Sequence, residues 1–192
     1  MNDAFYQVLT VLAEAFEDLN IGYYIGGSIA STTYGMPRST MDVDVVAEIE
    51  RLHVPPLVAR LTPLGYLDTG SIYAAIAGRR SFNLIPLQGP AKIDVFLPQD
   101  RPFDHAIFTR VRYVDLDPRA TRPFALPSPE DIILLKLEWF EQTNRQSRHQ
   151  WPDVIGVLQG QHDQLDWAYL QQWAAVLGLT ALLTQARTEA GV

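Results

Sequence analysis

The 192-residue chain contains no cysteine, which excludes a disulfide framework and any zinc site built on thiolates. Its histidines are few and follow no metal-ligand spacing; they are His53, His105, His149 and His162. No apolar run approaches the roughly 20 residues that span a bilayer. Acidic residues interrupt the apolar N-terminal segment, which argues against a secretory signal. We therefore expect a soluble cytoplasmic protein with no membrane partner.

Positive charge is also scarce, and the net charge is −7, which argues against a general nucleic-acid coat protein. Residues 70–125 are the exception, with eight Lys and Arg against five Asp, a local charge of +3. Those cations are Arg79, Arg80, Lys92, Arg101, Arg110, Arg112, Arg119 and Arg122. Two interpretations stay open: a face for a polyanionic substrate, or solvated arginines along strand edges.

The order of apolar patterns predicts an α+β fold. Before residue 71 we expect helices over 4–19, 28–34 and 55–64 and strands over 23–25 and 41–47. Over 71–126 we expect an antiparallel meander with strands at 72–77, 82–87, 92–97, 107–114 and 124–126. Helices follow from Ser128 and over 151–159, 166–177 and 180–190, with Gly160 and Gly178 as stops.

These patterns predict two domains. The first, residues 1–126, would be a mixed or antiparallel sheet packed on helices. The second, residues 127–192, would be a helical module.

The chain is organised around residues 23–47, in which a Gly-Gly-Ser turn and an Asp-Val-Asp strand follow one another. Gly26 and Gly27 make the turn, and Ser28 is placed to cap the next helix. Asp42 and Asp44 stand two apart in a strand, so both face one side, about 7 Å apart. Two neighbouring carboxylates repel each other, and a divalent cation removes that cost.

A third carboxylate, Asp94, lies in a similar β-branched run. If its strand neighbours 41–47, three acids converge, and oxygen ligands without His or Cys favour Mg²⁺ or Mn²⁺. Three acids that share two metals suit in-line phosphoryl or nucleotidyl displacement, with Asp94 as the general-base candidate. An Asp-x-Asp pair alone is common on exposed edge strands, as is Gly-Gly-Ser in turns, so the combination carries the prediction.

Two cations have alternative interpretations. Arg38 either reaches a phosphate or forms a salt bridge with a loop carboxylate. Lys136, one of only two lysines, lies in an apolar helix. It either extends its ammonium to solvent or points at a polar site. Asp153 could point at the same kind of polar site. The tryptophans are expected in the core.

The motifs Ile25-Gly26-Gly27-Ser28, Asp42-Val43-Asp44-Val45 and Ile93-Asp94-Val95 resemble the nucleotidyltransferase superfamily, which has the DNA polymerase β-like fold. Three further segments resemble the bacterial branch of AbiEii-like toxin and minimal nucleotidyltransferases: residues 35–42, 126–136 and 147–153.

The resemblance implies an Mg²⁺- or Mn²⁺-dependent enzyme that transfers a nucleoside monophosphate from an NTP donor to RNA, protein or a small molecule. Asp42, Asp44 and Asp94 would bind the metal, and Gly26, Gly27 and Ser28 would bind the triphosphate. Arg38 and Lys136 are further candidates for nucleotide contact on their positions in this chain, with the alternatives given above. It also implies a toxin–antitoxin setting with an antitoxin partner. The alternative is a non-catalytic interaction protein that keeps the fold, with a Lys or Arg in place of the metals.

Overall fold

The computed structural model describes residues 3–118 and 120–192 of the chain. These residues form two compact units. We call residues 3–26 and 39–126 the sheet unit, and residues 27–38 and 127–192 the helical unit. The break at Leu126 lies where the second domain was expected to begin, but residues 27–38 group with the C-terminal helices. The assignment of 1–126 and 127–192 as functional domains stays a prediction.

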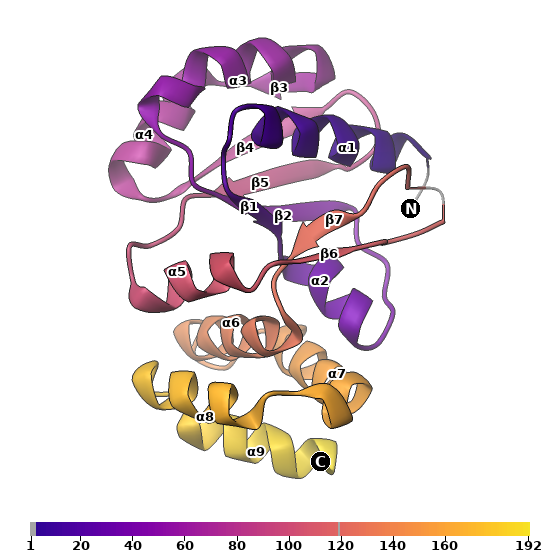
Figure 1. Ribbon diagram of the computed structural model, residues 1–192, viewed down its shortest axis with the longest axis vertical. Coiled ribbons are helices and arrows are strands. Elements are labelled where there is room, and N and C mark those ends of the chain that lie inside the picture. Colours follow the sequence, from indigo (N-terminus) through magenta and orange to yellow (C-terminus); the bar gives the residue numbers. More distant parts are fainter. Residues whose placement is uncertain (1–2, 119) are drawn as a thin grey trace. The chain divides into compact units, whose positions relative to one another are not determined.

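The sheet unit contains a five-stranded sheet in the order β1-β2-β5-β4-β3 (Figure 1). Its strands are β1 (Tyr23–Ile25), β2 (Asp42–Ala47), β3 (Gly65–Leu67), β4 (Ser81–Pro86) and β5 (Lys92–Phe96). Strands β2 and β5 are parallel, whereas the other neighbouring pairs are antiparallel. A separate two-stranded ribbon pairs β6 (Arg112–Val114) with β7 (Phe124–Leu126). The predicted mixed sheet of an α+β fold is therefore confirmed.

Period-2 alternation divides the central strands into an apolar and a polar face. The apolar face is fully buried and includes Val43, Val45, Ile93 and Val95. Neighbouring helices of the same unit pack together and reach the sheet at β3 and β4 (Figure 1). These helices are α1 (Asp3–Asp18), α3 (Val54–Leu61) and α4 (Thr69–Gly78). Helix α5 (Pro102–Thr109) follows β5, and short 3-10 turns lie at Arg51–His53 and Thr62–Leu64.

The helical unit consists of α2 and the helices after Leu126. They are α2 (Gly27–Tyr34), α6 (Pro129–Gln142), α7 (Gln150–Gln161), α8 (Trp167–Val176) and α9 (Thr180–Ala190), with a 3-10 turn at His162–Gln164. Helix α6 begins as predicted, because the Ser128 hydroxyl accepts the Asp131 N–H at 3.2 Å. Gly178, at φ +72°, follows α8 as the predicted stop.

Two predicted strands are wrong. Residues 72–77 lie in α4, whose first turn is capped by Asp68 through the N–H groups of Gly70 and Ser71. Residues 107–114 are divided between the end of α5 and the short strand β6. Both are short segments, in which periodicity alone does not separate helix from strand. The predicted meander is accordingly interrupted by α4 and α5.

Gly160 does not end a helix as predicted but lies inside α7, where it allows close packing. A Cβ on Gly160 would come 2.5 Å from the Tyr34 carbonyl oxygen, and one on Gly35 would come 2.6 Å from the Gly156 carbonyl carbon. The side-chain amide of Gln161 also donates a hydrogen bond to the Tyr34 carbonyl at 3.0 Å. These contacts hold α2 against α7 within the helical unit. Among the described helices, none is long and apolar enough to cross a membrane.

Candidate active site

The polar face of the central sheet carries the three predicted metal ligands. In the parallel pair β2 and β5, Asp44 lies directly opposite Asp94, and Asp42 lies opposite Lys92. Residues opposite each other in neighbouring strands face the same side, and so do residues two apart in one strand. Asp42, Asp44 and Asp94 therefore share one face of the sheet, which we call the acidic face.

Lys92 contributes a positive charge to the acidic face. Its Nζ lies 2.7 Å from Asp94 Oδ2, and the Lys92 and Asp94 side chains are 41% and 17% exposed. The hydrogen bond to Asp94 and then the charge of Asp94 raise the pKa of Lys92, with smaller contributions from Asp42 and Asp44. Lys92 therefore stays protonated and compensates part of the negative charge of this face.

A divalent metal is the group that this carboxylate set would be expected to hold. Among the residues that the structure describes, no three His, Cys, Asp or Glu side chains are grouped closely enough to bind a metal ion. The donor chemistry does fit Mg²⁺ or Mn²⁺, because the acidic face offers carboxylate oxygens from two adjacent strands. Binding requires the side chains to converge and Lys92 to leave Asp94, so the metal role of the three aspartates stays a prediction.

The Gly-Gly-Ser turn supplies the start of α2. The Gly26 N–H donates to the Asp44 carbonyl at 2.8 Å and continues the pairing of β1 with β2. This N–H is therefore engaged by the sheet, and the role of Gly26 in binding the triphosphate stays a prediction. Gly27 has φ +53°, a conformation that favours glycine, and it begins the helix. The first amides of a helix, here those of Gly27 and Ser28, have no intrahelical acceptor.

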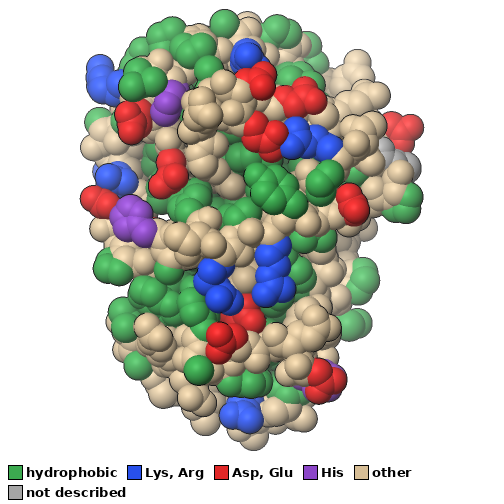
Figure 2. Space-filling view, in the orientation of Figure 1, with side chains coloured by type: hydrophobic (Ala, Val, Ile, Leu, Met, Phe, Trp, Pro, Cys, Tyr) green, Lys and Arg blue, Asp and Glu red, His purple; other side chains and the backbone are tan. Residues whose placement is uncertain are grey.

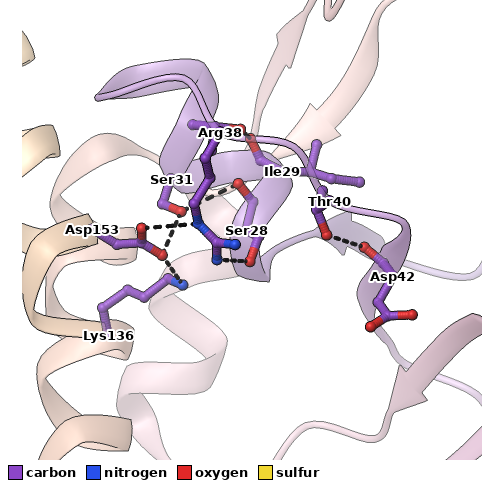
Figure 3. A network of polar contacts seen from close by, with 9 residues as sticks. Ser28, Ile29, Ser31, Arg38, Thr40, Asp42, Lys136 and Asp153 are labelled. Carbon is purple, nitrogen blue, oxygen red and sulfur yellow. Dashed lines mark hydrogen bonds and ion pairs between the residues drawn. The ribbon is translucent and has the colours of Figure 1, made fainter. Parts of the chain in front are cut away.

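A polar cluster in the helical unit brings together Ser28, Ser31, Arg38, Lys136 and Asp153 (Figure 3). We call it the Asp153 cluster. Lys136 Nζ donates to Asp153 Oδ2 at 2.7 Å, and Ser31 Oγ donates to the same oxygen at 3.0 Å. Arg38 Nε lies 3.4 Å from Asp153 Oδ1, and its Nη2 donates to Ser28 Oγ.

Burial and charge act in opposite directions on Asp153, whose side chain is 8% exposed. Burial alone would raise the pKa of Asp153. The hydrogen bond and charge of Lys136, followed by those of Arg38, outweigh burial and hold the pKa below its usual value. Asp153 is therefore an ionised carboxylate that fixes two cations, one of them the buried Lys136.

Sequence reasoning selected Ser28, Arg38 and Lys136 separately, and the structure brings them together in this cluster. It missed Ser31, although Ser31 follows Ser28 by three residues and so lies on the same side of α2. It also gave Lys92 no role, although Lys92 precedes Asp94 by two residues and must share its face.

Four of the eight cations of residues 70–125 form ion pairs with acids in the part of the chain that the structure describes. Lys92, Arg79, Arg101 and Arg122 pair with Asp94, Asp100, Asp104 and Glu17. Figure 2 shows Lys and Arg interspersed with Asp and Glu on the face in view. Arg119 lies outside the described residues. This pairing favours the interpretation of these cations as ordinary surface arginines.

No protein-family model matches the chain, and no curated protein sequence matches it. Solved structures do match. A solution structure of the antibiotic-resistance factor ANT(2'')-Ia has a TM-score of 0.54 at 16% identity, over 98% of this chain and 100% of that one. ANT(2")-Ia in complex with adenylyl-2"-tobramycin gives 0.53 at 13% identity, over 90% of this chain and 95% of that one.

A third structure, an antigenic nucleotidyltransferase-like protein from Paracoccidioides brasiliensis, has a TM-score of 0.52 at 19% identity, over 96% of this chain and 92% of that one. At these identities the likeness shows the fold. The chain thus has the nucleotidyltransferase-type α+β fold that its motifs predicted. The resemblance to the AbiEii-like branch stays a prediction.

Proposed function

We propose that the chain is a metal-dependent nucleotidyltransferase that moves a nucleoside monophosphate from an NTP to an acceptor hydroxyl. The observation that carries this proposal is the register of β2 against β5, which puts Asp44 beside Asp94 with Asp42 on the same face. The nucleotidyltransferase-type fold supports it.

The acidic face would hold Mg²⁺ or Mn²⁺ through Asp42, Asp44 and Asp94. Such a metal, when bound, neutralises phosphate charge and lowers the pKa of the attacking hydroxyl. Asp94 would accept the proton of that hydroxyl, because it has a free carboxylate oxygen once Lys92 moves off it.

The helical unit would contribute groups that bind the donor phosphates. The first amides of α2, from Gly27 and Ser28, lie at a helix N-terminus and would donate to a bound phosphate. Arg38 and Lys136 add positive charge, and a guanidinium forms paired hydrogen bonds with phosphate oxygens. Asp153 and Ser31 would act as positioning residues that keep these cations in place.

For the acceptor we favour a small molecule over RNA or protein. One structural neighbour is a complex with adenylyl-2"-tobramycin, an adenylylated small molecule. The pairing of cations in residues 70–125 gives no support to a polyanionic acceptor. An antitoxin partner and a cytoplasmic location are further proposals that rest on the sequence alone.

A transfer assay tests the proposal. The protein is incubated with Mg²⁺, each α-³²P-labelled NTP in turn, and separate pools of hydroxylated small molecules, RNA and protein. We expect label in the small-molecule pool, and loss of at least about a hundredfold in rate for Asp94→Asn, since general-base and metal-ligand roles each contribute on that scale. Equal labelling by wild type and Asp94→Asn would contradict it.

The non-catalytic alternative has one observation in its favour. Lys92 already compensates Asp94, and Asp153 already engages Arg38 and Lys136, so charges that would meet a metal or a phosphate are satisfied internally. This alternative predicts that Mg²⁺ and NTP bind no better to the wild type than to a variant without the aspartates.

A further inference from the structure

Lys92 occupies a particular position on the acidic face. It precedes Asp94 by two residues in β5, so it shares that face, and the β2–β5 register sets it opposite Asp42. Its ammonium contacts Asp94 Oδ2 at 2.7 Å. The Lys92 ammonium thus lies on the same face as the three carboxylates and contacts one of them, Asp94.

The three carboxylates need a counter-charge when no metal is present. Like charges on adjacent strands repel each other and destabilise the sheet. Lys92, through its contact with Asp94, compensates part of this negative charge.

A bound dication would meet this ammonium at close range and be repelled by it. Lys92 is 41% exposed, and its four-carbon stem is flexible, so it can swing into solvent without a change of backbone.

We propose that Lys92 is a built-in counter-ion of the acidic face, which occupies Asp94 until a divalent cation displaces it and so sets the metal affinity. This inference rests on the proposed metal-binding role of Asp42, Asp44 and Asp94. It adds that the chain itself competes with the metal, which a neutral side chain at position 92 would not do.

The test is Mn²⁺ binding to the full-length protein at low ionic strength, measured by electron paramagnetic resonance of the free ion. We expect Lys92→Met to bind Mn²⁺ about two- to fivefold more tightly, the range that corresponds to an exposed ion pair, and Lys92→Arg to stay near the wild type. The matched control is Arg60→Met, which removes one cation from the same unit but breaks only the exposed pair with Asp18.

Thermal unfolding gives a second readout. Without metal, Lys92→Met should melt below the wild type, and Mn²⁺ should raise its melting temperature by more than it raises that of the wild type. Unchanged or weaker Mn²⁺ affinity in Lys92→Met, the same gain in Arg60→Met, or no Mn²⁺ binding by any variant would overturn the inference. If affinity rises as expected but no labelled product forms in the transfer assay, the counter-ion role holds and the enzymatic function fails.

Discussion

Asp153 carries the charge balance of its cluster. It is an ionised side chain that is 8% exposed, and it contacts Lys136, which is 7% exposed, and Arg38, which is 33% exposed. A complete buried ion pair is often close to neutral for stability, whereas removal of one partner leaves an uncompensated charge away from water. Substitutions of Asp153 should therefore affect folding as well as phosphate binding.

Asp153→Asn removes that negative charge while it keeps the size of the side chain. We expect the free energy of unfolding to fall by about 3 kcal/mol, because the Lys136 ammonium is then buried without its counter-ion. Urea denaturation followed by circular dichroism measures it. Asp163→Asn is the control, since Asp163 is 83% exposed and its loss should change stability by less than about 0.5 kcal/mol. An equal effect of both substitutions would contradict the prediction.

The lowered pKa of Asp153 predicts how this difference depends on pH. A depressed folded-state pKa contributes stability that is present above the unfolded value, about 3.9, and is lost as the pH falls toward the folded value. The gap in unfolding free energy between wild type and Asp153→Asn should therefore be constant from pH 7 to about 5. It should narrow below about pH 4, and a gap that stays unchanged down to pH 3 would argue against an ionised Asp153.

At the scale of elements, α2 packs against α7. Gly156 and Gly160 lie four residues apart and so face the same side of α7. They leave room for the backbone of Tyr34, Gly35 and Met36. This close approach positions α2, and with it the amides of Gly27 and Ser28.

Gly160→Ala tests this packing. Alanine favours a helix interior by about 1 kcal/mol over glycine, but here its Cβ would meet the Tyr34 carbonyl oxygen at 2.5 Å. We expect a net loss of about 1–3 kcal/mol of stability in thermal or urea unfolding, since overpacking against backbone outweighs the propensity gain. Gly70→Ala in α4 is the control, because its Cβ would find only ordinary contacts at 3.6 Å and should not destabilise. A stabilising Gly160→Ala would contradict the packing.

The elements that the sequence predicted well are those with several concurring signals. Helix α6 has a serine cap, a proline in its first turn and an apolar face, and α9 was expected over the residues that it occupies. The strand predicted over residues 72–77 was wrong, because the apolar run IYAAIA fits a strand or a helix and the deciding signal is the cap from Asp68, which lies outside it. The shared face of Asp42, Asp44 and Asp94 followed from period 2 once their strands were expected to be neighbours.

Long-range contacts were beyond the reach of local patterns. Ser31 and Asp153 are 122 residues apart in sequence, and Lys136 and Asp153 belong to different helices. Whether Arg38 meets a carboxylate or a phosphate also could not be decided from spacing. Arg38 contacts a carboxylate in the structure, that of Asp153 in α7 rather than of a loop residue, and its contact with a phosphate stays a proposal.

At the scale of the whole molecule, the chain passes between its two units more than once. It leaves the sheet unit after Gly26, returns at Ser39 and leaves again at Leu126. The motif of residues 23–47 is thereby shared: its acids belong to the sheet unit, whereas Gly27, Ser28 and Arg38 belong to the helical unit. Each unit can therefore be tested through its own residues, metal binding through the acids and phosphate binding through Arg38 and Lys136.

The most direct test of nucleotidyl transfer is one that needs no acceptor. Calorimetric titration of ATP, GTP, CTP and UTP with Mg²⁺ compares the wild type with the Asp42→Asn, Asp44→Asn double variant, and circular dichroism verifies that both are folded. We expect at least one NTP to bind the wild type with Mg²⁺, and to bind the double variant at least about tenfold more weakly, because metal-bridged phosphates lose their ligands. Equal affinity of every NTP for the two proteins would contradict the proposed enzyme.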